Sequence, residues 1–128
     1  LTIMGIRTMS YEEKQFLEKS KNINIIYKDE VFDKISEVIE SIRGKKIYLS
    51  VDLDVLDPAH VPCIGNPEPG GLSYSEALEV IRRIVEVSDV RGMDFVEFAP
   101  CQGMRSDAYL VARLIGKAIG YHSLNSRN

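Results

Sequence analysis

The sequence predicts a three-layer α/β protein built around a parallel β-sheet. Three observations lead to this prediction. Short β-branched runs alternate with longer segments of helical periodicity, several helical segments carry recognisable end signals, and polar residues follow the strand-like runs. Strands that alternate with helices form β-α-β units, whose strands lie parallel in one sheet. In such sheets the chemistry gathers at the carboxyl ends of the strands.

Each element is predicted from its local pattern. Four segments are short and apolar, which predicts strands at residues 2–6, 22–27, 46–51 and 90–98. Four others carry apolar residues at helical spacing, which predicts helices at residues 10–19, 31–42, 73–85 and 106–121. Ser10 and Ser73 are suitable N-caps, and Glu76 completes a capping box with Ser73. Gly44 stands where a C-cap glycine belongs.

Composition narrows the class of protein. The 128 residues suit a single domain (1–128), and a net charge of -3 with a pI near 5.4 argues against nucleic-acid binding. No apolar run is long enough to cross a membrane. Cys63 and Cys101 lack a metal-finger spacing, so we expect reduced thiols in a cytoplasmic protein, with a disulfide as the alternative. The chain starts inside a strand-like run without Met, so we expect a segment of a longer protein.

The sharpest chemical feature is an Asp-x-Asp pair at the end of the third predicted strand. Residues two apart on a strand project to the same side, so Asp52 and Asp54 are predicted to share one space. Two close carboxylates repel each other, and a divalent cation removes that conflict. The alternative interpretation is that both residues only end the strand and cap the following turn. Asp57, before Pro58, is interpreted as a turn initiator.

The wider sequence around this pair resembles the ureohydrolases of the agmatinase/arginase family. Residues 50–58 (SVDLDVLDP) and 65–72 (GNPEPGGL) are similar to the signature of that family. Residues 92–100 (GMDFVEFAP) resemble the strand that delivers a substrate-facing glutamate. Residues 5–7 (GIR) and 112–117 (ARLIGK) also resemble strings of agmatinase-type members, so the resemblance spans essentially the whole chain.

The resemblance implies an arginase/deacetylase-type α/β fold, of which this chain is the C-terminal portion. It implies hydrolysis of a guanidino compound, with agmatine preferred, to urea and an amine by two Mn ions. Asp52 and Asp54 match metal-binding aspartates, and Glu97 matches the carboxylate that receives the guanidinium. The alternative for Glu97 is an ion pair with Arg105 or Arg113. The resemblance also implies that the complete protein is a homo-oligomer, either a trimer or a hexamer.

The departures from the family pattern are as informative as the matches. Asn66 stands where members usually carry Thr, and His60 and His122 do not match the histidines of the family. The remaining family ligands, a histidine and an Asp-x-His-x-Asp cluster, come from earlier strands and have no counterpart here, so no catalytic residue is assigned. We therefore predict that this chain supplies half of an active site and that the isolated chain is inactive. The alternative is a non-catalytic structural or subunit-type protein that needs a separate N-terminal chain.

Overall fold

The computed structural model describes residues 1–125, in which every predicted strand and helix forms in the predicted order. No helix in this range is both long and apolar enough to cross a membrane. Two short 3-10 turns, η1 (Lys28–Glu30) and η2 (Leu53–Val55), follow β2 and β3. The strands and α-helices are β1 (Thr2–Ile6), α1 (Tyr11–Lys19), β2 (Asn24–Tyr27), α2 (Val31–Ile42), β3 (Lys46–Asp52), α3 (Tyr74–Val87), β4 (Asp89–Val96) and α4 (Arg105–Asn125).

The predicted end signals set the boundaries of three helices. The Ser10 hydroxyl accepts a hydrogen bond from the Glu13 N–H, and the Glu13 carboxylate accepts one from the Ser10 N–H. Ser73 and Glu76 form the same reciprocal pair at the start of α3. Both pairs are capping boxes, which satisfy backbone donors that the first helical turn leaves free. Gly44, just past α2, has a φ of +67°, which glycine adopts without steric cost.

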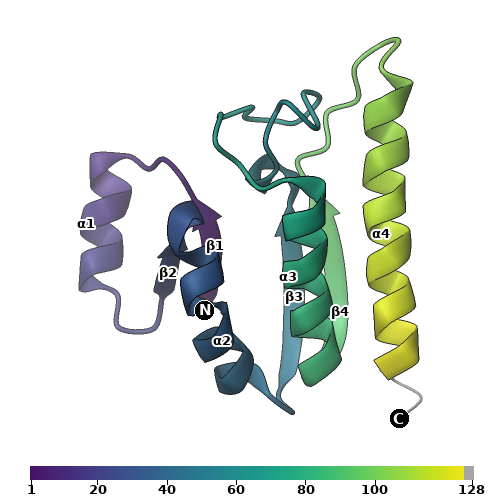
Figure 1. Cartoon of the computed structure of the whole chain (residues 1–128). Coiled ribbons are helices and arrows are strands. Elements are labelled where there is room, and N and C mark those ends of the chain that lie inside the picture. The colour runs from purple at the N-terminus through teal and green to yellow at the C-terminus, as the bar shows by residue number, and fades with distance from the viewer. Residues whose placement is uncertain (126–128) are drawn as a thin grey trace.

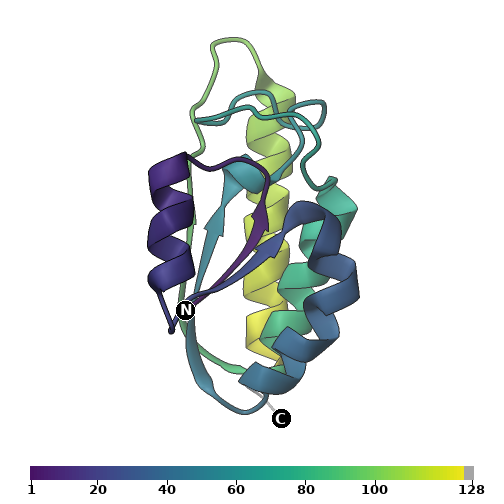
Figure 2. The same cartoon turned by 90° about the vertical axis from the view of Figure 1, so that its left-hand side faces the viewer.

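The elements form layers, as predicted. Helix α1 lies on one side of the strands, and α2, α3 and α4 lie on the other (Figures 1 and 2). One apolar core fills the space between the β3–β4 pair and helices α3 and α4, with Val85 and Leu114 fully buried in it. A second core joins β2, α2 and α3, around Ile26, Ile35 and Ile84. Helix α1 has no buried residue, so the packing rests on the other three helices.

The strands depart from the prediction of one continuous sheet. β1 pairs with β2 and β3 pairs with β4, both in parallel, which gives two separate two-stranded sheets within residues 1–125. A groove of about 700 Å³ lies between the facing edges of β1 and β3. The apolar pattern that predicts a strand is local and does not reveal which strands become neighbours. The prediction was therefore right about the strands and wrong about their continuity.

Truncating the core between α3 and α4 should destabilise the protein. Leu114 is fully buried, so Leu114→Ala is expected to lower the free energy of unfolding by about 2–5 kcal/mol, from lost apolar contact plus the cavity left behind. Leu124 lies on the same helix but is 63% exposed, and Leu124→Ala should change stability by only about 0.5 kcal/mol or less. Urea denaturation of both variants measures the difference. Equal losses would contradict the assignment of this core.

Candidate active site

The register of β3 against β4 brings the predicted site residues to one edge of the sheet. Asp52, the last residue of β3, lies opposite Val96, the last residue of β4. Glu97 follows Val96 directly. Because the two strands are parallel, Asp52 and Glu97 emerge at the same carboxyl edge, which is where α/β proteins assemble their sites.

Asp52 and Asp54 do not lie on one strand, so the predicted alternation is wrong in its geometry. The strand ends at Asp52, and Asp54 belongs to the 3-10 turn η2. Asp52 is the N-cap of that turn, and its Oδ1 accepts a hydrogen bond from the Asp54 N–H at 2.9 Å. This contact matches the alternative interpretation, in which Asp52 caps the turn that follows the strand. Burial and, to a smaller extent, the Asp54 charge raise the pKa of Asp52, against the opposing effect of the hydrogen bond from the Asp54 N–H.

Asn66 holds the carboxylate of Asp54 through both of its oxygens. The Asn66 backbone N–H donates to Oδ1 at 3.0 Å, and its side-chain amide donates to Oδ2 at 3.0 Å. In the sequence, Asn66 stands out only as a departure from the family pattern. The structure instead places it on Asp54. An ionised carboxylate has about four lone-pair directions, so these two bonds leave Asp54 able to accept further partners.

Gly65 lies between Glu97 and Asp54 and lets them approach. The Gly65 N–H donates to the Glu97 carbonyl at 3.0 Å. A Cβ at Gly65 would overlap the Glu97 carboxylate and would lie 3.5 Å from Asp54 Oδ2. Glu97 itself has a φ of +64°, the one positive value among the non-glycine residues of the described chain. Residues held in this conformation cost free energy and cluster at functional sites, so the surrounding loops hold Glu97 in place.

The alternative interpretation of Glu97 as an ion-pair partner is not observed. The ion pairs found within residues 1–125 include none from Glu97 to Arg105 or Arg113. Glu97 is an exposed residue at the mouth of the sheet edge.

Arg7 connects the end of β1 to the turn that carries Asp54. Its guanidinium donates to the Val55 carbonyl at 3.0 Å and to the Asp54 carbonyl at 2.6 Å. The carboxyl ends of β1 and β3 are thereby held at the same edge. The Arg7 Nε–H is buried and has no acceptor in the described part of the chain. Buried donors without an acceptor are rare in folded proteins, so this one calls for an explanation.

Asp57 begins the turn that was predicted at Asp57-Pro58 and also closes the long loop after it. Its Oδ1 accepts from the Ala59 N–H, and its Oδ2 accepts from the N–H groups of Gly70 and Gly71. The bond from Ala59, followed by those from Gly70 and Gly71, lowers the pKa of Asp57. Asp57 is therefore a structural anchor that fixes both ends of the loop carrying Gly65 and Asn66.

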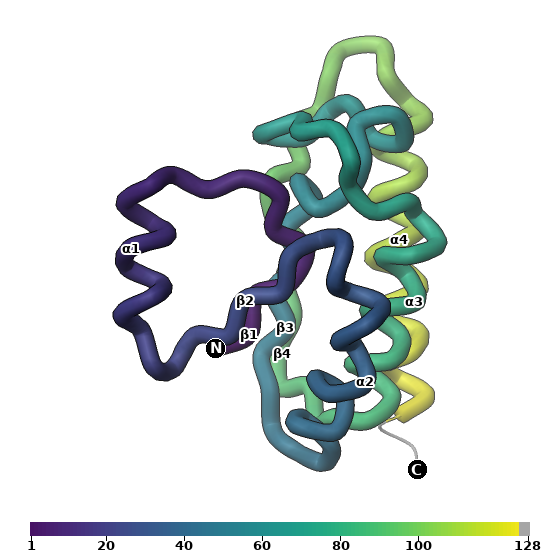
Figure 3. Tube along the Cα trace, turned by 60° about the vertical axis from the view of Figure 1, so that its left-hand side comes forward, coloured from purple at the N-terminus to yellow at the C-terminus, as the bar shows by residue number. Residues whose placement is uncertain are grey.

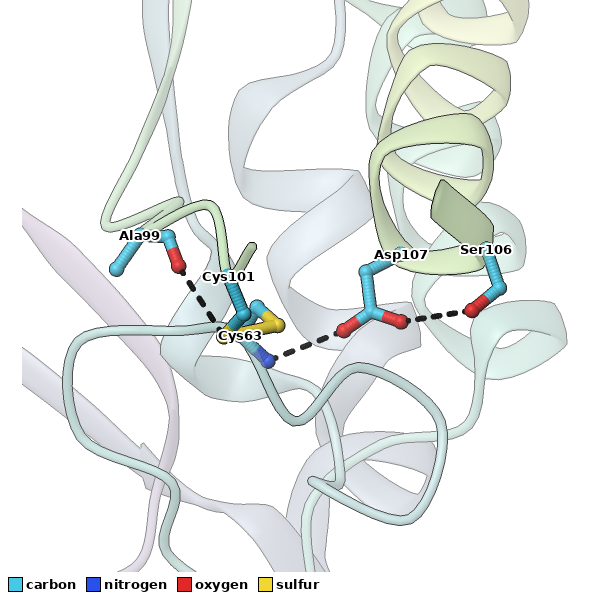
Figure 4. Close-up of a disulfide and its surroundings, with 5 residues drawn as sticks. All are labelled: Cys63, Ala99, Cys101, Ser106 and Asp107. Atoms are coloured by element: carbon cyan, nitrogen blue, oxygen red, sulfur yellow. Dashed lines mark hydrogen bonds between the residues drawn. A yellow bond between two sulfur atoms is a disulfide. The ribbon is translucent and has the colours of Figure 1, made fainter. Parts of the chain in front are cut away.

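Cys63 and Cys101 form a disulfide, which corrects the expectation of reduced thiols (Figure 4). Their Cα atoms lie 5.6 Å apart, within the ordinary range for a disulfide. Two segments distant in sequence pair near it, since Ile64 and Phe98 form an antiparallel bridge and the Ala99 N–H donates to the Cys63 carbonyl. A disulfide is rare in a cytosolic protein, and the sequence spacing of the cysteines gave no sign of it.

Asp107, in the first turn of α4, anchors the same loop from the other side. It is 2% exposed, and its carboxylate accepts hydrogen bonds from the Cys63 N–H at 3.1 Å and from the Ser106 hydroxyl at 3.1 Å (Figure 4). Sequence reasoning missed this residue. A buried carboxylate with two donors is satisfied, so its role here is to position the loop.

The two aspartates are of the type that binds a divalent cation, but there are too few ligating side chains for a complete site. Asp52 and Asp54 offer the hard oxygen ligands that Mn and Mg accept, and the pKa of Asp52 is raised, mainly because the carboxyl group is partly buried. Within residues 1–125, however, no group of three or more His, Cys, Asp or Glu side chains is placed to hold a metal ion. Two carboxylates are too few to hold a dinuclear metal centre.

The structure combines parallel strands in α/β layers, an Asp-x-Asp turn and a glutamate at the end of a strand. This combination indicates the arginase family. Residues 1–120 match the family model described as the arginase family, and the chain belongs to that family. Among its relatives, it is 35% identical over 127 residues to an N(1)-aminopropylagmatine ureohydrolase of Synechocystis sp.. That alignment covers 97% of this chain and 41% of the relative.

Other relatives and solved structures agree in kind. The chain is 39% identical over 98 residues to an agmatinase of Bacillus anthracis, which covers 75% of this chain and 33% of the relative. It superposes on the agmatine ureohydrolase of Thermoplasma volcanium with a TM-score of 0.76 and 30% identity, covering 96% of this chain and 42% of that one. The arginase fold predicted from the sequence is thus confirmed, and the chain spans less than half the length of these relatives.

Asp52 and Asp57 should change stability in opposite directions with pH. The raised pKa of Asp52 means that its stabilising contribution is present below the unfolded-state pKa of about 3.9 and is lost as pH rises through the folded-state pKa. Asp52→Asn should therefore raise the free energy of unfolding at pH 7 and have little effect near pH 3. The lowered pKa of Asp57 reverses the sign, so Asp57→Asn should destabilise at pH 7, with the gap closing as pH falls below about 3.9.

Denaturation in EDTA-containing buffer at several pH values measures both effects, since chelation keeps stray metal from stabilising wild type. An Asp52→Asn variant less stable than wild type at pH 7 would contradict the electrostatic account of this site.

The disulfide should contribute to stability through the loop it closes. Its cysteines are 38 residues apart, and closing a loop of that size is worth about 3–4 kcal/mol in the chain-entropy description. Cys101→Ser should lower the free energy of unfolding by about that amount, and the variant should not respond to reductant. Wild type should lose the same amount when dithiothreitol is added during urea denaturation. Equal stability of wild type with and without reductant would show that the bond does not form.

Proposed function

We propose that this chain supplies one half of a Mn-dependent ureohydrolase site that hydrolyses the guanidino group of agmatine. The reaction adds water to the guanidino carbon and releases urea and a primary amine. Agmatine is preferred as substrate because several relatives carry agmatinase in their names, and N(1)-aminopropylagmatine is a second guanidino compound of the same kind. A homo-oligomer is part of the same proposal.

The observation that supports this proposal is the position of Asp52, Asp54 and Glu97 at the same edge of the β3–β4 sheet. Asp52 and Asp54 provide oxygen ligands from a single turn, and Glu97 approaches Asp54 across Gly65. A carboxylate suits Glu97's proposed role because its two oxygens match the planar N–H fork of a guanidinium. Metal bound at the neighbouring aspartates would supply an activated water.

Each residue around these carboxylates has a positioning role in the proposal. Asn66 would hold Asp54 in one orientation through its two hydrogen bonds. The Gly65 N–H and the disulfide at residues 63 and 101 would keep Glu97 against the loop. Misplacing reacting groups by about 1 Å can cost 10²-fold in rate, so such support is an ordinary requirement of a site.

A second candidate function is a non-catalytic subunit. It is favoured by the absence, within residues 1–125, of a third ligating side chain beside Asp52 and Asp54. A protein of this kind would keep the fold for assembly and would contribute no carboxylate to turnover. The two functions differ in what happens to activity when the carboxylates are removed from an assembled complex.

The test is a colorimetric urea assay with agmatine, N(1)-aminopropylagmatine and arginine, with and without Mn. We expect no urea from the 128-residue chain alone, because two aspartates are too few for a dinuclear centre. When the chain is co-expressed with the part of the Synechocystis relative that it does not match, we expect turnover. Rates of ~1 per second or faster by the chain alone would refute the half-site proposal.

Variants in the co-expressed complex separate catalysis from assembly. Asp52→Ala and Glu97→Ala should each lower kcat/KM at least ~10²-fold if these side chains act on metal and substrate. Glu37→Ala, an exposed carboxylate on α2, is the matched control and should leave the rate unchanged. Unchanged activity in Asp52→Ala would instead support the non-catalytic subunit.

A further inference from the structure

Two loops at the carboxyl edge of the β3–β4 sheet are joined by a covalent bond. The loop that follows β3 and the loop that follows β4 lie side by side at the same end of the molecule (Figures 1 and 3). Cys63 belongs to the first loop and Cys101 to the second, and their disulfide links the two (Figure 4). Glu97 lies between the end of β4 and Cys101, so the state of this bond bears on the position of Glu97.

The two cysteines lie in different surroundings. Cys63 is 2% exposed, and its backbone is held on both sides, because its N–H donates to Asp107 and its carbonyl accepts from the Ala99 N–H. Cys101 belongs to a run, residues 99–106, in which every residue is exposed. The rate of thiol–disulfide exchange depends on which sulfur a thiolate can reach. A thiolate that approaches from solvent therefore meets Cys101 before Cys63.

Glu97 has an unfavourable backbone conformation that only a few contacts maintain. Its φ of +64° is costly for a residue other than glycine. On its C-terminal side, the Gly65 N–H donates to the Glu97 carbonyl at 3.0 Å, and Ile64 and Phe98 form an antiparallel bridge. The net contribution of a few hydrogen bonds and the cost of a left-handed residue are similar in size. The covalent bond at Cys101 can therefore decide whether Glu97 keeps this conformation.

We propose that the disulfide between Cys63 and Cys101 is a reversible redox switch that sets the position of Glu97. In the oxidised chain, the bond ties residues 99–106 to the buried loop, and Glu97 stays against Gly65. In the reduced chain, the exposed segment separates from this loop and Glu97 relaxes to an ordinary φ. The proposal rests on the proposed function in one respect: the switch controls substrate binding because Glu97 receives the guanidinium.

The reductant in this proposal is a dithiol. One of its thiolates attacks Cys101 Sγ and forms a new S–S bond, while the electron pair of the broken bond leaves on Cys63 Sγ, which takes up a proton from water. The second thiolate of the reductant then displaces Cys101 Sγ, which is protonated in turn. The protein gains two electrons and two protons in total, and the dithiol becomes a cyclic disulfide. Glutathione disulfide reverses the change and is itself reduced to two molecules of glutathione.

The structure favours re-formation of the bond after reduction. Cys63 remains buried, and its hydrogen bond to Asp107 does not depend on the disulfide. The segment that carries Cys101 is anchored at its far end by α4, which begins at Arg105 and contributes Asp107. Closing a short loop between two anchored ends costs little entropy. Cys101 therefore stays within reach of Cys63, as a reversible switch requires.

A permanent structural bond is the alternative. Such a disulfide stabilises the folded chain as a whole, and its reduction would lower the free energy of unfolding without loosening Glu97 in the folded state. The switch predicts a local change in the folded protein instead. The order of the Glu97 backbone in the folded chain therefore distinguishes the two roles.

Nuclear magnetic relaxation of backbone ¹⁵N measures this order directly. The full 128-residue chain is compared in its oxidised form and in dithiothreitol. We expect order parameters of ~0.85 at Glu97, Phe98 and Ala99 in the oxidised chain and values below ~0.6 in the reduced chain, with β3 and α3 near ~0.85 in both. Unchanged order at Glu97 would overturn the proposal, and so would a loss of order throughout the chain.

Two variants of the exposed segment separate the bond from its surroundings. Cys101→Ser removes the disulfide and leaves Cys63 in place, so it should show order parameters below ~0.6 at Glu97 without reductant and no response to dithiothreitol. Gln102→Ser, at the next exposed position, keeps both cysteines and should behave like wild type. Circular dichroism shows whether each variant folds, and the wild-type comparison needs no variant. An ordered Glu97 in folded Cys101→Ser would contradict the switch.

The urea assay tests whether the switch controls substrate binding. The chain is co-expressed with the part of the Synechocystis relative that it does not match, and agmatine is the substrate. Reduction of the complex should raise KM at least ~10-fold, and glutathione disulfide should restore it. The Cys101→Ser complex should have the raised KM from the start and no further response, which controls for cysteines of the added part.

The two readouts separate the failure of this proposal from the failure of the proposed function. A loosened Glu97 with an unchanged KM would overturn the switch and leave the hydrolase standing. An oxidised complex that releases no urea would refute the hydrolase, and the relaxation measurements on the chain alone would still decide whether the bond controls Glu97.

Discussion

The in-register parallel pairing of β3 and β4 is the constraint on which the site depends. Since Asp52 lies opposite Val96, the loops that follow these two strands start side by side and turn towards each other. They then pair again at the bridge between Ile64 and Phe98. Gly65 is carried by one loop and Glu97 precedes the other. A shift of one residue in the β3–β4 register would reverse the face of every side chain and separate Asp52 from Glu97.

The loops around this edge contain two kinds of residue. Some carboxylates are fully hydrogen-bonded and stabilise the loops, and other residues have an energetically unfavourable charge or backbone conformation. Asp57 accepts three backbone N–H bonds, and the buried Asp107 accepts the Cys63 N–H, so both carboxylates are satisfied. Asp52 is different, because burial and a neighbouring negative charge raise its pKa. Glu97 adds a left-handed backbone conformation. A shifted pKa and a left-handed backbone are both energetically unfavourable for the fold. Residues of this kind cluster at functional sites, where they serve ligand binding rather than stability.

Local patterns in the sequence predicted the elements well, and long-range contacts explain what they missed. The capping boxes at Ser10 and Ser73 and the periodicity of α2 depend on neighbours within one or two turns, so they could be read directly. The position of Asp52 and Glu97 at one sheet edge could be predicted because each lies at the end of a predicted parallel strand. Three contacts could not be predicted because they join residues far apart in the sequence, which no local periodicity encodes. The hydrogen bond from Asn66 to Asp54 spans 12 positions, the one from Cys63 to Asp107 spans 44, and the disulfide spans 38. The 3-10 turn after Asp52 replaced the expected alternation because the Asp52 side chain caps it.

The shortage of ligating side chains beside Asp52 and the divided sheet occur at the same place in the described part of the chain. A sheet edge can assemble ligands only from strands that end there, and within residues 1–125 the neighbour of β3 on its β1 side is a groove rather than a strand. The same place therefore lacks both backbone partners and ligating side chains.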